Sequence, residues 1–260
     1  MDLDLLGKNA LVCGSTQGIG KATAIALAKM GATVFLLARN EEKLKKVKSQ
    51  LDNSRGQKHD YLCADFSDVN QIKNVAHELE RINIHILINN TGGPASGPIA
   101  SAKSHDFEEA FQMHVVCNQI LSQAVVDNMK KAYYGRIVNV ISTSVKVPIN
   151  GLGVSNTIRG AVASWAKTMA NELGQYSITV NNVLPGFTKT SRLKTLIYKK
   201  AQVQKVSEKH VADGMLSTVP ASRFGEAEEV ANAIAFLCSP AAAYVNGINL
   251  PVDGGRTGTL

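Results

Sequence analysis

The chain has 260 residues, of which 45% are hydrophobic, and a formal net charge of +7 at pH 7. A chain of this length buries roughly three quarters of the surface that it exposes when unfolded, which is enough for one large domain. No apolar run approaches the roughly 20 residues that a membrane helix needs, and residues 1–4 are acidic where a signal peptide would be basic. We therefore expect a cytoplasmic protein that has no membrane partner.

The positive charge and the cysteines exclude further classes. The lysines stand in mixed clusters such as residues 41–46, which are typical of a solvated helix face rather than a nucleic-acid surface, so no nucleic-acid partner is expected. The four cysteines, Cys13, Cys63, Cys117 and Cys238, lie in apolar segments without paired spacing. This predicts reduced, buried thiols and neither a metal site nor a disulfide framework.

Short runs of Val, Ile and Leu alternate with longer amphipathic stretches, as they do where crossover helices join parallel strands. The pattern predicts an α/β fold, a doubly wound parallel sheet (Rossmann fold) with helices on both faces, as a single domain over residues 1–260. The expected strands are 9–13, 33–38, 61–63, 84–88, 136–140, 179–184 and 249–252. The expected helices begin near Gly18, Glu41, Val69, Asp106, Asn156 and Glu226.

One irregular stretch, residues 186–220, follows the sixth expected strand. Ligands of open α/β sheets bind beyond the carboxyl ends of the strands. We therefore interpret residues 186–220 as a lid that covers a substrate.

A glycine-rich loop follows the first expected strand. Its residues are Gly14, Ser15, Thr16, Gln17, Gly18, Ile19 and Gly20. Glycines allow a tight turn and the close approach of a pyrophosphate, whose charge the free N–H groups of a helix N-terminus attract. The spacing Gly-x-x-x-Gly-x-Gly differs from the commoner Gly-x-Gly-x-x-Gly, and such a loop can also be an ordinary turn. Its place after the first strand of an α/β pattern favours a dinucleotide site.

The second expected strand is followed by Arg39, where a carboxylate would accept hydrogen bonds from an adenosine ribose. A carboxylate repels a 2′-phosphate, whereas a guanidinium pairs with it. NADP is therefore favoured over NAD as the cofactor. The alternative is that Arg39 is only a solvated residue after a strand.

Further motifs follow the later strands: residues 89–92 (Asn-Asn-Thr-Gly), 135–139 leading to Ser142, 185–186 (Pro-Gly) and 251–255 (Pro-Val-Asp-Gly-Gly). With the glycine-rich loop, they make the chain resemble the short-chain dehydrogenase/reductase family over nearly its whole length. Among family members it is similar to the 3-oxoacyl-acyl carrier protein reductases.

The resemblance implies roles for several residues. Asp65 would meet the adenine ring, Asn89 would lie beside the adenosine ribose, and Thr188 would lie near the nicotinamide amide. The rest of the implied cofactor site is Thr91, Gly92, Pro185 and Gly186. The resemblance also implies a homotetramer or homodimer formed through the fourth and fifth helices and the C-terminal strand.

The reaction centre departs from the family pattern. Family reductases use a serine to polarise the carbonyl, a tyrosine to donate the proton, a lysine to lower the tyrosine pKa and hold the nicotinamide ribose, and an asparagine to anchor a water relay. Ser142 matches the serine, but the tyrosine position holds Ser155, the lysine position Arg159 and the asparagine position His114. Residues 161–173 keep the family pattern, which supports the register. The chain therefore resembles a divergent subgroup without the Tyr-x-x-x-Lys pair.

These departures limit the chemistry. An aliphatic hydroxyl is a far weaker acid than a phenol, so Ser155 cannot simply replace tyrosine. Arg159 cannot relay protons, although it can hold ribose hydroxyls or a substrate carboxylate and stabilise an oxyanion. His114 is a candidate for proton exchange at neutral pH, or else a histidine hydrogen-bonded inside the fourth helix. Ser142 could likewise be only a strand-end hydroxyl.

Three functions remain open. The leading one is an NADP-linked oxidoreductase acting on a carbonyl or alcohol, in which Ser142 and Ser155 hold the carbonyl, Arg159 stabilises charge, and His114 or a substrate group manages the proton. The others are a nucleotide-binding or scaffold protein without turnover, and a lyase, dehydratase or isomerase that uses the same cleft. The basic residues of 190–218 would suit an acidic or carrier-linked substrate, or form the solvated face of a lid.

Overall fold

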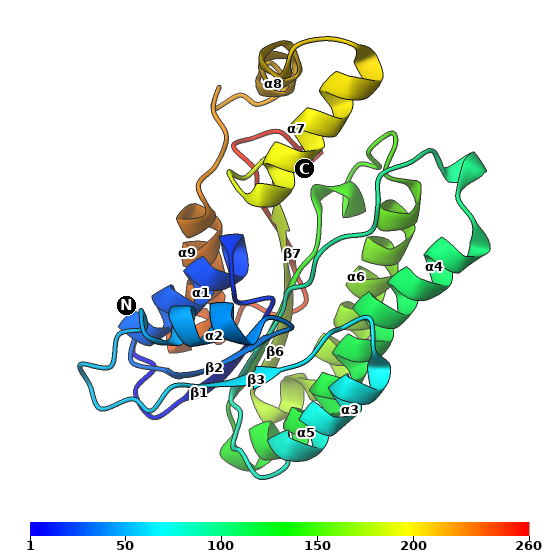
Figure 1. Ribbon diagram of the computed structural model, residues 1–260. Coiled ribbons are helices and arrows are strands. Elements are labelled where there is room, and N and C mark those ends of the chain that lie inside the picture. The colour runs from blue at the N-terminus through cyan, green and yellow to red at the C-terminus, as the bar shows by residue number, and fades with distance from the viewer. Residues whose placement is uncertain (260) are drawn as a thin grey trace.

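The computed structural model describes residues 1–259 and shows one seven-stranded parallel sheet with helices on both faces (Figure 1). The strand order is β3-β2-β1-β4-β5-β6-β7. The strands are β1 (Asn9–Cys13), β2 (Thr33–Ala38), β3 (Asp60–Cys63), β4 (Ile86–Asn89), β5 (Gly135–Val140), β6 (Ile178–Pro185) and β7 (Asn249–Val252). The predicted doubly wound single domain is confirmed.

The α-helices connect these strands. They are α1 (Gly18–Lys29), α2 (Glu41–Lys48), α3 (Val69–Leu79), α4 (Ser104–Phe111), α5 (Cys117–Ala132), α6 (Gly153–Leu173), α7 (Ser191–Gln204), α8 (Glu208–Leu216) and α9 (Ala227–Cys238). A π-helical segment, η2 (Gln112–Val116), joins α4 to α5, and a short 3-10 segment, η3 (Thr143–Val145), follows β5.

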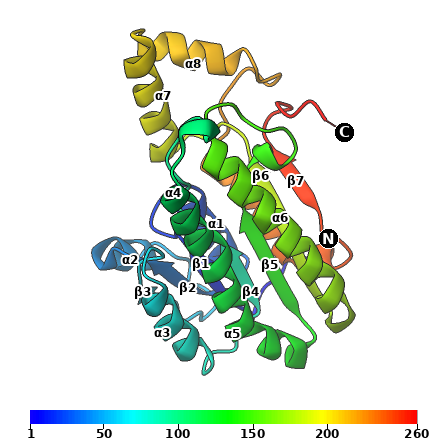
Figure 2. The same ribbon diagram turned by 90° about the vertical axis from the view of Figure 1, so that its right-hand side faces the viewer.

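Two apolar layers hold the helices against the sheet (Figures 1 and 2). Helices α1, α2 and α9 cover one face through buried residues such as Leu27, Leu44 and Ile234. Helices α3, α5 and α6 cover the other face, where Ile72 and Leu121 are among the buried residues. Because both faces are covered, the central strands β4, β5 and β6 are buried along almost their whole length, and most of their residues are apolar, as is usual for parallel strands.

The strand order reverses between β1 and β4, since β2 and β3 extend the sheet to one side and β4 begins the other side. At such a switch point, the loops that leave the carboxyl ends of the two strands diverge and leave a crevice. The glycine-rich loop after β1 and residues 90–93 after β4 border this crevice.

The stretch predicted to be irregular, residues 186–220, contains two helices. Thr190 caps α7 by accepting from the Leu193 N–H, and Ser207 caps α8 by accepting from the His210 N–H. The two helices bury Leu193, Val211 and other apolar residues against each other rather than against the sheet. Figures 1 and 2 show them standing beyond the carboxyl ends of the strands.

Some boundaries differ from the prediction. The fourth strand begins at Ile86 rather than at residue 84, and the helix expected near Asn156 begins at Gly153. The sequence pattern also merged α4 and α5 and gave no sign of the π-helical segment between them.

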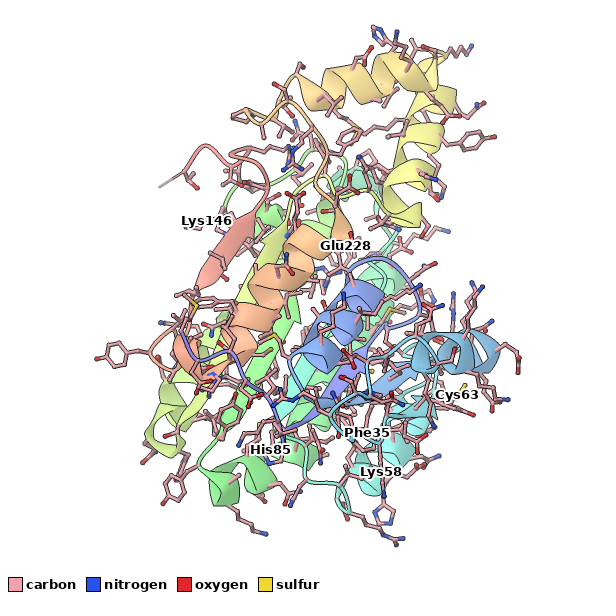
Figure 3. All side chains as sticks on the ribbon, turned by 90° about the vertical axis from the view of Figure 1, so that its left-hand side faces the viewer. Phe35, Lys58, Cys63, His85, Lys146 and Glu228 are labelled. Carbon is pink, nitrogen blue, oxygen red and sulfur yellow. The ribbon has the colours of Figure 1, made fainter. Side chains whose placement is uncertain are left out.

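The thiols are only partly as predicted. Cys13, Cys117 and Cys238 are free and buried, but Cys63 is exposed. It ends β3, the edge strand of the sheet, where Figure 3 shows it near α2 at the side of the molecule. An edge strand has a neighbour on one side only, so its last residue is not enclosed.

Within the described residues, no helix combines the length and the hydrophobicity that crossing a bilayer requires.

Candidate active site

The glycine-rich loop forms a tight cradle at the end of β1. Gly14 has a φ of 59°, and a Cβ on it would overlap the backbone oxygen of Asn90. A Cβ on Gly20 would overlap the backbone oxygen of Gly14. Helix α1 begins at Gly18, and its N-cap residue Gln17 makes no side-chain capping bond, so N–H groups at this helix end are left for a ligand. The cradle therefore fits a pyrophosphate, which needs close backbone approach and free N–H donors.

Two predicted cofactor residues meet beyond the ends of β2 and β3. An Arg39 Nη1 lies 3.4 Å from Asp65 Oδ2, and 76% of the Arg39 side chain is exposed. The Ser67 N–H and the Arg39 guanidinium hold the pKa of the Asp65 carboxyl below its usual value. The structure thus brings the carboxylate of Asp65 and the exposed cation of Arg39 together beyond the ends of β2 and β3, where the adenosine half of a dinucleotide was expected.

A row of asparagines crosses the sheet below the crevice. The Nδ2 of Asn89 donates to Asn139 Oδ1, that of Asn139 to Asn182 Oδ1, and that of Asn182 to Asn249 Oδ1, at 2.8 to 2.9 Å. These residues are partners in the registers of β4, β5, β6 and β7. From the sequence, only Asn89 was expected at the site, although an asparagine within each of four strands was the available signal.

The other predicted cofactor residues also lie at this edge of the sheet. Thr91 hydrogen-bonds to His114, and Ser15 is buried and donates to the Leu37 oxygen. Gly186 follows β6, and a Cβ on it would lie 2.6 Å from the Cα of Asp253. Thr188 is buried and donates to the Gly186 oxygen at 3.2 Å. Each of these loops leaves the carboxyl end of a strand, as the sequence predicted.

Ser142 and Arg159 converge at the end of β5. Ser142 Oγ caps η3 by accepting from the Ser144 N–H at 3.1 Å. Arg159 lies on α6, which packs against η3 and η2, and its Nη1 donates to the Val140 oxygen at 3.2 Å. Ser155 precedes Arg159 by one helical turn and is half-buried.

Arg159 is a buried cation. Only 7% of it is exposed, and within residues 1–259 no carboxylate forms an ion pair with it. Burial, and secondly the charge of Arg192, lowers the pKa of its guanidinium to about 10. The side chain therefore still carries its charge at neutral pH, in surroundings that screen it far less than water does.

His114 lies in the π-helical segment with 1% of its surface exposed. Its Nδ1 is 2.7 Å from Thr91 Oγ1, and its Nε2 is buried without a hydrogen-bond partner in the described residues. Burial, and secondly the charge of Arg159, lowers the pKa of the imidazole to about 3. The idea that His114 titrates near neutrality is therefore not supported, because burial beside a cation keeps the ring neutral.

The described tyrosines do not replace the missing one. Tyr134 donates to the Cys238 oxygen beside α9, and Tyr198 on α7 is 53% exposed. The candidate reaction centre therefore contains hydroxyls, a neutral imidazole and a guanidinium.

A second guanidinium reaches the same place. Arg192, in the first turn of α7, donates from Nη2 to the Pro94 oxygen at 2.7 Å. A Cβ on Gly93 would lie 3.4 Å from Arg159 Nη2 and 3.6 Å from Arg192 Nη2. From the sequence, Arg192 was expected only as one of the basic residues of the lid, because its proximity to Arg159 arises from the tertiary fold.

A seven-stranded, doubly wound sheet with this cradle defines a class, the dinucleotide-binding oxidoreductases. Comparison with known proteins is consistent with that class. The family model described as "Enoyl-(Acyl carrier protein) reductase" matches residues 14–257.

The chain is 32% identical over 258 residues to gluconate 5-dehydrogenase of Gluconobacter oxydans, covering 98% of this chain and 97% of that protein. It is 32% identical over 257 residues to the 3-oxoacyl-[acyl-carrier-protein] reductase FabG of Aquifex aeolicus, covering 98% and 99%. The L-sorbose reductase of Gluconobacter frateurii, solved with NADPH and L-sorbose, superposes with a TM-score of 0.93 at 28% identity, covering 100% of both chains. The chain belongs to the short-chain dehydrogenase/reductase family of oxidoreductases.

Proposed function

We propose that this protein is an NADP-dependent oxidoreductase that interconverts a carbonyl and an alcohol through a reaction centre based on fixed positive charge. The observation that carries the proposal is the Arg159 guanidinium, which is buried at the end of β5 and bonded to the Val140 oxygen. Arg159 occupies the position at which the family has its lysine. The chain also has the glycine-rich loop that forms the family's dinucleotide cradle.

NADP is the proposed cofactor. The uncapped start of α1 and the close approach of Gly14 and Gly20 suit its pyrophosphate, and Arg39 suits its 2′-phosphate. The related L-sorbose reductase was solved with NADPH.

Replacing Arg39 tests this cofactor choice. We expect Arg39→Ala to weaken NADPH binding about 10- to 100-fold, the effect of losing one charge-assisted contact, and to leave NADH binding unchanged. Fluorescence titration of both cofactors measures the two affinities, and Lys43→Ala on neighbouring α2 is the matched control. Equal losses for both cofactors would show that Arg39 does not recognise the 2′-phosphate.

When bound, NADPH supplies the hydride. Ser142 Oγ already accepts a hydrogen bond from the Ser144 N–H, so its own hydroxyl hydrogen is free to donate to the substrate oxygen. Ser155 offers a second hydroxyl from the first turns of α6. The charge of Arg159 stabilises the negative charge that develops on that oxygen, and a preorganised donor in such a site changes kcat by about 10²–10³.

The proton has a different source from that in tyrosine-dependent relatives. His114 is neutral at the pH of the cell, and Arg159 holds its proton, so we propose that a water molecule protonates the alkoxide and that the hydroxide left behind takes up a proton from bulk solvent. His114 contributes a fixed neutral ring, since Thr91 bonds its Nδ1 and its Nε2 is buried without a partner in the described residues.

A screen of ketones, aldehydes and the matching alcohols tests the proposal, with the change in reduced-nicotinamide absorbance as the measurement. The double variant Ser155→Tyr with Arg159→Lys separates two outcomes. A gain in ketone reduction shows that the nicotinamide geometry is intact, and loss of a native activity shows that the altered pair has its own function.

A second candidate is cofactor binding without turnover. It is favoured by the low pKa of His114, which leaves the site without a side chain that exchanges protons near neutrality. This candidate predicts tight NADPH binding with no reaction across the panel, and one efficient substrate would exclude it. Product formation without any absorbance change would instead indicate a lyase or isomerase.

Three further features belong to the proposal. Helices α7 and α8 act as the substrate lid, the chain assembles as a homotetramer or homodimer, and the protein is located in the cytoplasm. Sedimentation of the 27.8 kDa chain measures the assembly directly.

A further inference from the structure

The reaction centre holds more positive charge than the proposed chemistry alone requires. Arg159 is buried without a carboxylate partner among residues 1–259, although a buried charge is strongly unfavourable unless another group compensates it. A ligand that brings a negative charge would remove this cost.

Arg192 adds a second cation at the same point. The Nη2 atoms of Arg159 and Arg192 both lie within 3.6 Å of the position that a Cβ would take on Gly93. The two Nη2 atoms are therefore no more than about 7 Å apart, a separation at which like charges repel. Their convergence over a residue without a side chain leaves a position where one anion can contact both.

The two arginines come from different parts of the fold. Arg159 stands on α6, fixed against the end of β5, whereas Arg192 stands on the first turn of α7 and is exposed. The Arg192 guanidinium donates to the Pro94 oxygen. A ligand anion would therefore connect the rigid reaction centre to the lid.

We infer that the substrate is an oxo acid whose carboxylate lies between Arg159 and Arg192, next to the carbonyl that is reduced. The inference rests on the proposed function and adds the substrate class. A carboxylate matches guanidinium groups in shape and charge, and two of them can hold it in one orientation. The cofactor has other partners for its own anions, since the start of α1 suits the pyrophosphate and Arg39 the 2′-phosphate.

The test is a binding measurement on the complex of the full chain with NADP, which needs no turnover. The probes are 2-oxo, 3-oxo and 4-oxo acids of five carbons, each compared with its methyl ester, and calorimetry gives the affinities. The variants are Arg192→Gln and Arg192→Lys. Lys194→Gln, which removes the same charge from an exposed position of α7, is the matched control.

We expect at least one acid to bind about 10-fold or more tightly than its ester, as a charge-assisted contact implies. Arg192→Gln should weaken the binding of the acid about 10- to 100-fold without changing the binding of the ester. Arg192→Lys, which keeps the charge, should weaken acid binding less. NADPH affinity should stay within about 2-fold, and Lys194→Gln should change nothing.

Three results would overturn the inference: no acid binds, acids and esters bind equally, or Arg192→Gln weakens NADPH binding as much as acid binding. The last result would assign Arg192 to the cofactor. Failure of the proposed function looks different, because acids would then bind with this preference while reduced nicotinamide is not consumed. Turnover of neutral carbonyls without any preference for acids would leave the function standing and remove the inference.

Discussion

Asn89 ends the row of asparagines with an unsatisfied acceptor, since its Oδ1 is buried without a partner in the described residues. Strand β1 lies next to β4, and Val12 pairs with Ile88. The next residue of each strand, Cys13 and Asn89, therefore lie beside each other. A thiol is a weak donor. The row in this chain therefore ends without a strong donor for the Asn89 oxygen.

A hydroxyl at position 13 should stabilise the protein. We expect Cys13→Thr to raise the free energy of unfolding by about 1 kcal/mol, the net value of one hydrogen bond, relative to Cys13→Val, which has the same shape without the hydroxyl. Urea unfolding of the two variants measures the difference. A threonine variant no more stable than the valine variant would show that the hydroxyl does not reach Asn89.

His114 should make stability depend on pH. Its pKa in the folded chain is about 3, and an unfolded histidine has a pKa near 6.5, so between these values the unfolded chain binds more protons. Stability should therefore fall as the pH drops from 6.5 towards 3, by at most about 1.4 kcal/mol per pH unit from this residue.

The variant His114→Asn should lose that part of the slope, and the exposed His210→Asn should keep it. Denaturant unfolding at pH 7, 6, 5 and 4 gives the slopes. Identical slopes for wild type and His114→Asn would mean that the buried imidazole is not held neutral.

At the level of elements, the start of α1 depends on a backbone contact. A Cβ on Gly20 would overlap the Gly14 oxygen, so Gly20→Ala must displace the loop from the crevice. We expect NADPH binding to weaken by about 100-fold or more, since the N–H donors of the helix move with the displaced loop.

Gly214→Ala on α8 is the control for Gly20→Ala, because a Cβ on Gly214 meets nothing within 4 Å. Fluorescence titration and circular dichroism separate loss of binding from loss of folding, and unchanged binding by a folded Gly20→Ala would contradict this view of the loop.

Elements that pack on the sheet were easier to predict than elements that do not. Strands such as β1 and β6 are short, mostly apolar runs, and α1 has an alanine-rich stripe after its glycines. In these elements the composition and the spacing of apolar residues predict the same secondary structure. Helices α7 and α8 pack on each other around a small apolar cluster, which leaves few apolar positions and a weak period. The π-helical segment that carries His114 joins α4 directly to α5. No residue pattern in the sequence marks it, because the chain stays helical on both sides.

For the molecule as a whole, the order of the motifs along the chain predicted the fold. Which distant residues come into contact, however, is decided by the fold itself. The sequence placed Ser142, Ser155 and Arg159 by their intervals, since Ser142 lies just after β5 and the next α-helix, α6, carries the other two. The approach of Arg192 to Arg159 depends on how distant segments of the chain meet in the fold, and the low pKa of His114 depends on burial. Neither can be predicted from the spacing of residues in the sequence.

In the proposed function, Arg159 supplies fixed positive charge to a working reductase. The direct measurement is NADPH oxidation across the carbonyl panel by wild type and by Arg159→Ala, with NADPH affinity measured in parallel. We predict that wild type turns over at least one carbonyl, and that Arg159→Ala lowers kcat by about 100-fold or more while the variant remains able to bind NADPH. Tight NADPH binding by wild type without turnover of any carbonyl, or a kcat unchanged in Arg159→Ala, would contradict the account.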